Sequence, residues 1–517
     1  MPNNQTPNER LMENRKRAKK GGGQDRIARQ HEKGKMTARE RISELLDPFS
    51  FQEINSFIEQ RKDLPGTDAS RILGDGVITG YGKIDGRTVY LFAQDFTVMG
   101  GSLGEGHSKK ICRVMDLAAQ NGSPIIGLID SGGARIQEGV RSLEGYSEIF
   151  RRNALYSGVI PQISLIMGPS AGGAAYSPAL TDFIFMVEKS AYMFITGPEV
   201  IKAVTGEEID FEGLGGAAVH AAASGVASLT APDEHACLAM CRKLISYLPL
   251  NNMENPPSGE AQDELARMDK SLDEIIPQDT THIYSMHDVI LRIVDTGSFM
   301  EIHPAFAPNA ITGFAHMNGS VIGLVAQEPS QLAGVLDIDA SDKICRFVRF
   351  CDAFNIPLVT FVDSPGFLPG IKQEHGGIIR HGAKVIFAYA EASVPKISVV
   401  TRKAFGGAYI VMSSKYLGTD VTFAWPTAEI AVMGADGAAK ILYRRTISQA
   451  DDPEAERARV IKEYTENYLT PYPAAKSGLI DEIILPSETR VRIIYALSAT
   501  KNKQVHNPAR KHGNPPV

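Results

Sequence analysis

The sequence predicts an α/β protein of two tandem domains that arose by an internal duplication. KICR occurs at Lys110–Arg113 and again at Lys343–Arg346, and AQD at 93–95 returns as AQE at 326–328, at the same displacement along the chain. Strand-like apolar runs alternate with helix-like segments and open onto glycine-rich turns, which is typical of α/β domains. A repeat with so long a period indicates two similar domains and not a solenoid.

The two copies stay aligned through the next turns. IDS in the first copy matches VDS in the second, and beyond these strand ends the displacement grows by one residue. Pro161 then aligns with Pro395, and Gly172-Gly173-Ala174 aligns with Gly406-Gly407-Ala408. A single inserted residue is ordinary loop variation, so the duplication extends over both turns.

The first segment, residues 1–50, is predicted to be a helical arm. It is charged, its apolar residues are thinly spaced, the run Gly21–Gly23 breaks it, and TARERISELL offers a threonine N-cap. Such a charge pattern is typical of a solvated face, and we prefer that interpretation to a nucleic-acid patch.

The first domain is predicted at 51–258. GDGVITGYGKIDGRTVYLFAQDF alternates around DG and indicates a hairpin, SKKICRVMDLAAQNG has helical spacing, and PIIGLID and PQISLIMG read as short buried strands. A polar stretch with Pro-Pro predicts a linker, placed at 259–280. The second domain, 281–517, opens with MHDVILRIVDTGSFMEI and ends in a charged helix and a basic tail.

Composition excludes several classes of function. Lys and Arg number 54 against 60 Asp and Glu, a net charge of −6, so there is no basic excess that would indicate nucleic acid as a partner. No apolar stretch resembles a signal peptide, and no run of about 18 apolar residues could insert into a membrane. Five cysteines, an odd number, fit a reducing compartment, and we expect a cytoplasmic protein.

Cys237 and Cys241 form a C-x-x-x-C pair on one face of a predicted helix, with His235 nearby. A zinc site usually needs four nitrogen or sulfur ligands, and no second pair is evident. Buried core cysteines are therefore the preferred interpretation, and no metal is expected.

Two glycine-rich turns are the strongest candidates for chemistry. Gly168-Pro169-Ser170-Ala171-Gly172-Gly173 stands between a strand and a helix of small residues, and Ala404-Phe405-Gly406-Gly407-Ala408-Tyr409 repeats it. Glycines let a group approach the backbone closely, and the start of a helix presents unpaired N–H groups. Each turn could hold an oxyanion, so the sequence predicts a protein that binds two polarised oxygens.

Two other interpretations were considered. GPSAG matches the nucleophile elbow of serine hydrolases around Ser170, and His316, His375 and His381 follow it in the chain order that such enzymes use. However, the second copy has Ala404 at the equivalent place. A scaffold without catalysis is also conceivable, although it would gain little from so many unconstrained glycine turns.

Longer motifs resemble a known family, the carboxyltransferase subunits of biotin-dependent acyl-CoA carboxylases, and within it the β chains of propionyl-CoA carboxylases. The motifs that carry this resemblance are AQDFTVMGGSLGE, DSGGARIQEG, GPSAGGAAYSPALTDFIFMV, MFITGPEVIKAVTGE, LDIDASDKICRFVRFCDAFNIPLVTFVDSPGFLPG, QEHGGIIRHGAK, RKAFGGAYIVMSSK and AWPTAEIAVMGADGA. The resemblance covers the chain from about residue 10 to its end. It implies two crotonase-like domains (ββα spirals), so that KICR would mark the same helix twice.

The resemblance also implies a reaction in which carboxybiotin on a partner protein exchanges its carboxyl group with a short-chain acyl-CoA. The enolate of the thioester and the ureido oxygen of biotin would each gain negative charge, and biotin itself would accept the α-proton, so no side-chain base is expected. By resemblance, Gly407 and Ala408 would hold the acyl-CoA carbonyl, and Gly172 and Gly173 the ureido oxygen. Other residues expected at the acyl-CoA site are Ser131, Gly132, Gly133, Ala134 and Arg135 in the first domain and Gly406 and Ile410 in the second.

Partners are implied because the chain lacks a Met-Lys-Met biotinylation motif, an evident ATP-binding segment and the Cys-x-x-Cys zinc ribbon of some relatives. A biotin carboxylase and biotin carrier subunit would supply the missing steps. In the family, six subunits usually form a trimer of dimers, and the site lies between the first domain of one subunit and the second domain of its neighbour.

Substrate and direction stay open at this stage. Propionyl-CoA carboxylated to methylmalonyl-CoA is favoured, but Ile410 stands where propionyl-CoA carboxylases commonly carry Asp. The transferase subunits of methylmalonyl-CoA decarboxylase and of transcarboxylase share the same motifs and run the reverse transfer.

Overall fold

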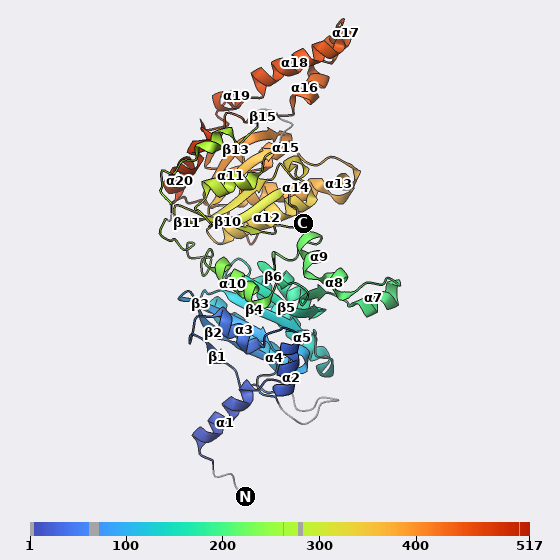
Figure 1. The fold of residues 1–517 in the computed structure, drawn as a ribbon, viewed down its shortest axis with the longest axis vertical. Helices are drawn as coiled ribbons and strands as arrows, with labels where there is room; N and C mark the ends of the chain where they lie inside the picture. The colour runs from blue at the N-terminus through green and yellow to red at the C-terminus, as the bar shows by residue number, and fades with distance from the viewer. Residues whose placement is uncertain (1–4, 61–71, 262, 278–282, 506) are drawn as a thin grey trace. The chain divides into compact units, whose positions relative to one another are not determined.

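The chain forms two compact units in a computed structural model, Met1–Glu254 (unit 1) and Asn255–Val517 (unit 2). The structure describes residues 5–60, 72–261, 263–277, 283–505 and 507–517. Figure 1 labels the helices and strands of each unit.

Unit 1 is built on a mixed sheet that the hairpin signal and the buried apolar runs predicted. Its strands are β1 (Gln52–Ile54), β2 (Val77–Ile84), β3 (Arg87–Gln94), β4 (Ile125–Ser131), β5 (Gln162–Ala171), β6 (Phe183–Val187), β7 (Tyr192–Phe194) and β8 (Leu229–Ala231). The order is β1-β2-β3-β4-β5-β6-β8, and β7 pairs with the end of β5. The first three strands are antiparallel and the rest parallel.

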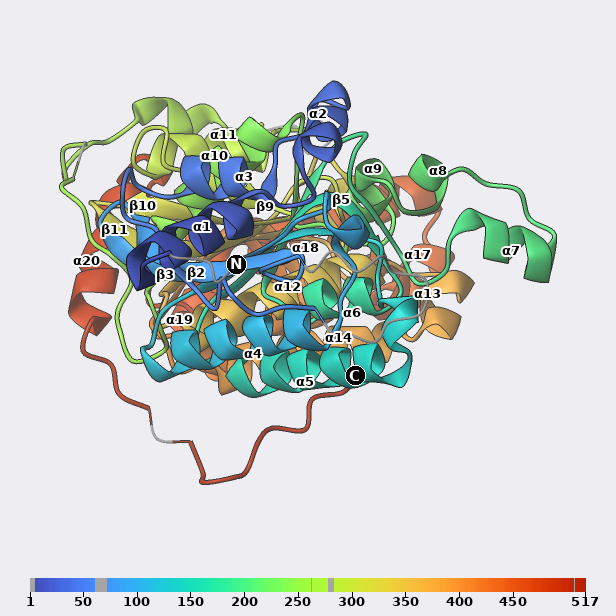
Figure 2. The same cartoon turned by 90° about the horizontal axis from the view of Figure 1, so that it is seen from below.

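Three helices of unit 1 precede its first strand, one follows its last strand, and the others lie between strands along the chain. They are α1 (Pro7–Lys19), α2 (Gln24–Glu32), α3 (Ala38–Leu45), α4 (Glu105–Gln120), α5 (Val140–Tyr156), α6 (Gly173–Ala179), α7 (Pro198–Thr205), α8 (Phe211–Gly215), α9 (Ala217–Ala222) and α10 (Glu234–Ile245), with short 3₁₀ turns η1 (Met99–Gly101) and η2 (Ile136–Glu138). Helices α4 and α5 lie side by side (Figure 2), and α4 packs against β2 and β3.

Unit 2 repeats the sheet strand for strand. Its strands are β9 (Met300–Ile302), β10 (Ala310–Met317), β11 (Ser320–Gln327), β12 (Leu358–Ser364), β13 (Lys396–Phe405), β14 (Val421–Ala424), β15 (Glu429–Ala431) and β16 (Glu482–Ile483). Their order is β9-β10-β11-β12-β13-β14-β16, and β15 pairs with the end of β13 as β7 does with β5. The predicted α/β class and the duplication are therefore confirmed.

The helices of unit 2 follow the same plan and then extend beyond it. They are α11 (Met286–Ile293), α12 (Ile338–Ala353), α13 (Ile371–Gly376), α14 (Ile378–Glu391), α15 (Gly406–Val411), α16 (Ala435–Leu442), α17 (Arg444–Gln449), α18 (Pro453–Tyr468), α19 (Pro471–Lys476) and α20 (Thr489–Thr500), with η3 (Lys270–Glu274), η4 (Leu332–Gly334), η5 (Lys415–Leu417) and η6 (Pro486–Glu488). KICR lies in α4 and again in α12, and the bounds of these two helices are separated by the same displacement as the motif. The motif therefore does mark one helix twice.

The two KICR lysines show that the repeat holds at the level of single atoms. Nζ of Lys110 donates to the carbonyls of Gly74 and Val77, and Nζ of Lys343 donates to those of Ala307 and Ala310, the equivalent positions of the second copy. Both side chains are buried, and burial lowers the pKa of each to about 8. Each lysine therefore anchors the loop that precedes the first long strand of its unit.

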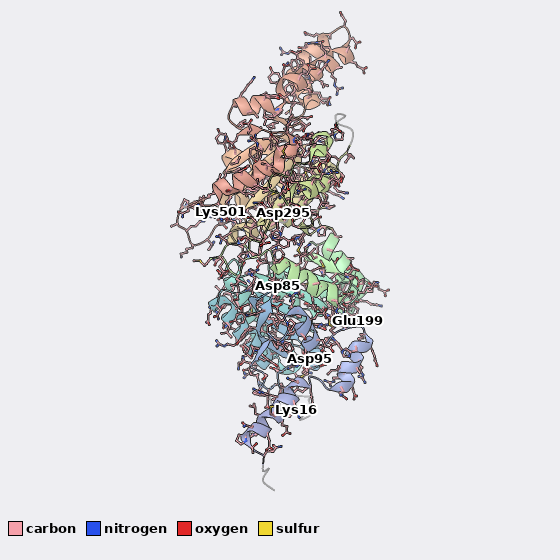
Figure 3. The ribbon with its side chains drawn as sticks, turned by 60° about the vertical axis from the view of Figure 1, so that its left-hand side comes forward. Lys16, Asp85, Asp95, Glu199, Asp295 and Lys501 are labelled. Carbon is pink, nitrogen blue, oxygen red and sulfur yellow. The ribbon has the colours of Figure 1, made fainter. Side chains whose placement is uncertain are left out.

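Only part of the predicted N-terminal arm is exposed to solvent. In α3, Arg41, Ile42 and Leu45 are buried, so the interpretation of the whole segment as solvated is wrong for this helix. Helix α3 of unit 1 corresponds to α11 of unit 2, and Asp47, just beyond α3, accepts the N–H groups of the β2–β3 turn. Asp295, whose position is labelled in Figure 3, does the same for the β10–β11 turn in unit 2.

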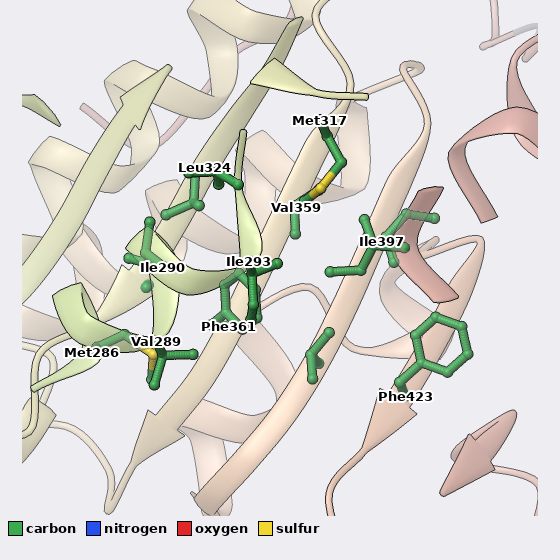
Figure 4. Packing of buried hydrophobic residues seen from close by; sticks show 14 of the residues in the cluster. Met286, Val289, Ile290, Ile293, Met317, Leu324, Val359, Phe361, Ile397 and Phe423 are labelled. Atoms are coloured by element: carbon green, nitrogen blue, oxygen red, sulfur yellow. The ribbon is translucent and has the colours of Figure 1, made fainter. Parts of the chain in front are cut away.

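The predicted linker at 259–280 is not a free connector in its described part. The division between the units falls between Glu254 and Asn255, and Leu272 and Ile276 belong to the buried core of unit 2. That core packs α11 against the sheet: Met286, Val289 and Ile293 face β12 and β13 (Figure 4). A stretch that reads as polar overall can still contribute two buried side chains at one face.

Among the described residues, no helix is both long and apolar enough to cross a membrane. All five cysteines are free and buried.

Candidate active site

The two glycine-rich turns occupy the same place in each unit. Strand β5 runs into α6 through Gly172, whose φ is 60°, and β13 runs into α15 through Gly406, whose φ is 53°. Positive φ is where glycine is favoured over residues that carry a Cβ. The glycine at this position therefore lets the chain reverse sharply from strand into helix and leaves the first N–H groups of the helix at the turn.

The structure changes which N–H groups are available in unit 1. The N–H of Gly172 donates to the carbonyl of Phe194 in β7 at 3.0 Å, so it is not a free donor in this structure, and its assignment to a ligand oxygen stays a prediction. Helix α6 begins at Gly173, and the first N–H groups of a helix have no partner within it. The candidate donors are therefore Gly173 and Ala174, which are the direct sequence equivalents of Gly407 and Ala408 in unit 2.

Each pair of donors is bordered by an aromatic ring from its own unit. A Cβ added to Gly173 would lie 2.8 Å from the ring of Tyr146, and one added to Gly407 would lie 3.4 Å from the ring of Phe367. Tyr146 is buried and Phe367 half-buried. The Gly173 side is closed by the ring, whereas Gly407 is exposed.

The turn Ser131–Arg135 directly adjoins the Gly172 turn. The buried Ser131 hydroxyl accepts the N–H of Gly133, and Gly133 has a φ of 97° and no room for a Cβ beside the carbonyl of Ala171. The N–H of Gly132 donates to the carbonyl of Gly100. Gly132 is exposed and Ala134 half-buried, so these two residues form the accessible part of the turn.

The side chain of Arg135 is buried. Its buried guanidinium donates to Asp75 at 2.6 Å, to Glu138 at 2.7 Å and to the carbonyl of Ser102 at 2.9 Å. Because the guanidinium is paired with two buried carboxylates, the predicted place of Arg135 near CoA concerns its backbone in the turn and not its side chain. Burial raises the pKa of Asp75, and Arg135 opposes that shift. The guanidinium therefore stabilises the turn by pairing with the buried carboxylate.

Ser170 cannot serve as a nucleophile in this arrangement. It is fully buried, and its Oγ donates to the carbonyl of Ala174 at 2.9 Å. Of the histidines considered with it, His381 pairs with Asp342 at 2.9 Å. The serine therefore stabilises the turn through a single hydrogen bond to the backbone. This structural role explains why Ala404 can stand at the equivalent position of the second copy.

Ile410 lies in the second turn of α15. Its side chain is 51% exposed. Its counterpart in α6 is Tyr176, which is 49% exposed and forms an edge contact with Phe150. Each unit thus carries one half-exposed side chain beside its donor pair, aliphatic in one case and aromatic in the other.

The cysteine pair is part of the core. Cys237 and Cys241 are fully buried, and burial raises the pKa of both thiols. Within the described ranges no cluster of three or more His, Cys, Asp or Glu side chains could hold a metal ion.

Two buried aspartates were missed by the sequence analysis. Asp130 and Asp363 are the penultimate residues of β4 and β12, directly before Ser131 and Ser364. Both are fully buried and paired with cations. The duplicated IDS and VDS could have drawn attention to them, since an acidic residue repeated within two buried strands requires a counter-charge.

Comparisons with known proteins agree with this geometry. The family model for the carboxyl transferase domain matches residues 29–515. The carboxyltransferase subunit of propionyl-CoA carboxylase from Haloferax mediterranei is 56% identical, and the α subunit of methylmalonyl-CoA decarboxylase from Propionigenium modestum is 53% identical. Each match extends over 507 residues and covers 98% of both chains.

A solved structure is similarly close. The crystal structure of transcarboxylase 12S, a hexamer with methylmalonyl-CoA and methylmalonic acid bound, superposes with a TM-score of 0.97 at 50% identity and covers the whole of both chains. This confirms the predicted crotonase-like fold. Together with the duplicated donor turns, these matches exclude the scaffold and hydrolase interpretations: the chain belongs to the carboxyl transferase family and is an acyl-CoA carboxyltransferase.

Proposed function

We propose that the chain transfers a carboxyl group between carboxybiotin, carried by a partner protein, and a short-chain acyl-CoA, with propionyl-CoA and methylmalonyl-CoA as the preferred pair. The observation that carries this proposal is the repeated turn, which offers two equivalent donor pairs, Gly173 with Ala174 and Gly407 with Ala408. A reaction in which two different oxygens gain charge needs two such sites.

The chain's own residues bind the two substrates and polarise their oxygen atoms. One donor pair holds the thioester oxygen, so that charge developing on it as the α-proton leaves is stabilised by fixed N–H groups that need no reorganisation. The other holds the ureido oxygen of biotin. When bound, carboxybiotin supplies the carboxyl group and a ureido nitrogen that can take the α-proton. This fits the absence of a candidate side-chain base beside either turn in the described residues.

The structure favours the turns of unit 1 as the binding site of the acyl thioester, which is the reverse of the assignment made from the sequence. The turn Ser131–Arg135, which by resemblance lies near CoA, touches Ala171 directly through Gly133. A thioester held by that turn would meet Gly173 and Ala174 first. Gly407 and Ala408, with the flat ring of Phe367 beside them, would then receive the ureido ring.

The assembly is proposed from relatives. Transcarboxylase 12S is described as a hexamer, and we propose the same trimer of dimers here. Each reaction would pair unit 1 of one subunit with unit 2 of its neighbour. Mixing a Gly173→Val subunit with a Gly407→Val subunit should then restore activity, whereas no recovery after demonstrated subunit exchange would contradict a shared site.

A biotin carboxylase and biotin carrier subunit is the proposed partner, in the cytoplasm. Five free, buried thiols fit a reducing compartment. The close match to a decarboxylase subunit keeps the reverse transfer as the second candidate, and the partners decide between them. Copurification with a biotin carboxylase supports the carboxylase, and copurification with a small biotin carrier and a membrane protein supports the decarboxylase.

The test of the reaction itself uses the purified full chain. With methylmalonyl-CoA and free biotin, it should form propionyl-CoA and carboxybiotin. With propionyl-CoA, bicarbonate and ATP but no partner, it should form no methylmalonyl-CoA. Carboxylation in the second assay, or release of free CoA thiol in the first, would contradict the proposal.

A further inference from the structure

The two buried aspartates at the strand ends hold equivalent places and have different counter-charges. In both units the aspartate N–H donates to a glutamine of the preceding strand, Asp130 to Gln94 and Asp363 to Gln327. The carboxylates therefore sit at the same point of the two sheets, one residue before the turn Ser131–Arg135 in unit 1 and its counterpart in unit 2. An isolated carboxylate at such depth would be strongly unfavourable.

In unit 2 the neighbouring strand neutralises the carboxylate. Arg402 of β13 reaches Asp363 through Nε at 3.1 Å, and the hydroxyl of Tyr284 donates to the same oxygen at 2.8 Å. The second oxygen accepts the N–H of Lys403 at 3.0 Å. The guanidinium also lies over the ring of Tyr284, 5.0 Å from its centroid.

Unit 1 lacks both of these groups on its strand. The position of Arg402 is taken by Gly168, and that of Lys403 by Pro169, which has no N–H to donate. Oδ1 of Asp130 accordingly has no hydrogen-bond partner among the described residues. Strand β5 thus lacks the cation that the equivalent strand of unit 2 carries.

The missing cation comes from the N-terminal segment. Lys35, between α2 and α3, places Nζ 2.6 Å from Oδ2 of Asp130, and Arg41 of α3 lies 3.0 Å from the same oxygen. Arg41 is shared with Glu234 at 2.5 Å. The buried cluster therefore holds two cations and two carboxylates, and Lys35 is the cation that belongs to Asp130 alone.

Lys35 also fills the volume that Arg402 fills in unit 2. A Cβ added to Gly168 would lie 2.5 Å from Nζ of Lys35. The ammonium lies over the ring of Phe96, 5.1 Å from its centroid, as the guanidinium lies over Tyr284 in the other unit. Burial lowers the pKa of Lys35 and Asp130 opposes that shift.

We propose that Lys35 is a positioning residue for the reaction. Its ammonium group pairs with Asp130 at the end of β4 and lies beside Gly168 of β5, where β5 itself provides no cation. By holding these two strand ends together, Lys35 fixes the positions of the turns Ser131–Arg135 and Gly168–Gly173. The N-terminal segment is then part of the unit 1 site. This inference rests on the proposed function in that it expects those turns to bind the acyl-CoA.

The experiment compares Lys35→Met with Lys33→Met in the full chain. Lys33 is an exposed lysine two residues away and is the matched control. Amide hydrogen exchange of the segment 168–174 should accelerate in Lys35→Met and not in Lys33→Met, since exchange reports local opening. This readout needs no substrate, so it judges the positioning role even if the proposed reaction fails its own test.

Ligand binding gives the second readout. Calorimetry should show propionyl-CoA binding weakened ~10–100-fold in Lys35→Met, because misplacing a site by about 1 Å costs effects of this size. Lys35→Arg should restore binding, and Arg402→Met in unit 2 should leave it unchanged. If Lys35→Met does not fold, Lys35→Met/Asp130→Asn removes both charges and should fold with the same weakened binding. Unchanged exchange at 168–174, or wild-type binding in a folded Lys35 variant, would overturn the inference.

Discussion

The turn after β4 and the turn after β12 share backbone hydrogen bonds and differ at three of their five residues. The carbonyl of Gly133 accepts the N–H of Leu103, and the carbonyl of Gly366 accepts that of Leu336, at 2.9 and 3.0 Å. Yet the sequence Ser-Gly-Gly-Ala-Arg in unit 1 is Ser-Pro-Gly-Phe-Leu in unit 2. A backbone that directs N–H groups is common to both copies, while the walls around it have diverged. This is expected of two sites that polarise the same kind of oxygen in two different molecules.

The polar core behind each turn has diverged as well. Arg135, held between Asp75 and Glu138, has an apolar counterpart, Leu368. Arg39 forms a two-pronged ion pair with Glu53, and the equivalent pair in unit 2 is His287 with Glu301. Unit 1 relies on permanent charges where unit 2 uses apolar contacts or a titratable ring.

The largest expected difference between the units is at Arg135. Arg135→Leu introduces the residue of the other copy but leaves Asp75 and Glu138 buried without their cation, which should lower the free energy of unfolding by about 3–5 kcal/mol. Chemical denaturation measures this loss. A change at the equivalent position of unit 2, Leu368→Met, involves no charge and should cost less than about 1.5 kcal/mol. Equal losses in the two variants would contradict the contrast between the units.

Substitutions in the two donor turns should lower the rate of carboxyl transfer. Gly173→Val and Gly407→Val should each lower the transfer rate by at least ~10²–10³-fold, the usual cost of losing an oxyanion donor. Alanine separates the two turns: a Cβ at 173 would meet the ring of Tyr146 at 2.8 Å, whereas one at 407 meets Phe367 at 3.4 Å. Gly173→Ala should therefore also lower Tm, and Gly407→Ala should not. A Tm loss confined to Gly407→Ala would reverse this assignment.

Chain-length preference should depend on Ile410. The α-carbon of the acyl group must reach biotin for transfer, so a side chain beside the Gly407 turn can limit the length of the acyl chain beyond that carbon. Ile410→Gly should shift the preference toward butyryl-CoA by ~10–200-fold in kcat/KM, the value of about one methylene in a pocket. The equivalent exposed residue of unit 1, in Tyr176→Phe, serves as the control. An unchanged ranking of acetyl-, propionyl- and butyryl-CoA in Ile410→Gly would place this residue outside the acyl pocket.

Ser170→Ala should have a small effect, because it copies the second unit. Losing the hydrogen bond to the carbonyl of Ala174 should cost about 1 kcal/mol of stability and leave kcat within a few-fold of wild type. Denaturation and the transfer assay measure these two quantities. Abolished activity in a folded Ser170→Ala protein would restore the nucleophile interpretation.

The smallest expected effect is the pH response of unit 2. Hydrogen bonds with Glu301 and then Glu328 raise the pKa of His287 to about 9 from its usual 6.5. A raised pKa means that the stabilisation is complete below about pH 6.5 and is lost as pH rises through about 9. His287 is more than a third exposed, so solvent screens the contribution and it is small.

The comparison is made by measuring Tm between about pH 6 and pH 10, the range that brackets the titration of this histidine. His287→Arg copies unit 1 and should flatten the alkaline part of the curve. Arg39→His should steepen it. A curve unaffected by either change would show that this pair does not contribute to stability.

Sequence reasoning located the duplicated turns because glycine and KICR repeat at a fixed displacement. It missed the start of the repeat because the connection between the first two strands runs from 55 to 76 in unit 1 and from 303 to 309 in unit 2. The displacement changes there, so α3 appeared unrelated to α11. It also did not reveal that the N–H of Gly172 pairs with β7, because this strand is only three residues long.

The buried charges were beyond the reach of the sequence for a different reason. Lys35 and Asp130 lie far apart in the chain, and a lysine in a charged segment is ordinarily a solvated one. Only the fold reveals that Gly168 leaves room for it. Likewise, the sequence does not reveal that the guanidinium of Arg135 is paired with Asp75 and Glu138, which lie in other parts of the fold.

The lysines of KICR have a chemical consequence for an enzyme that handles thioesters. An amine attacks a thioester only in its neutral form, and with a pKa of about 8 Lys110 and Lys343 are neutral far more often than an ordinary lysine. Their burial among backbone carbonyls keeps them out of reach of acyl-CoA. The burial that lowers each pKa thus also prevents acylation, so acylation of Lys110 in α4 or Lys343 in α12 would record how often that unit has opened in the presence of its own substrate.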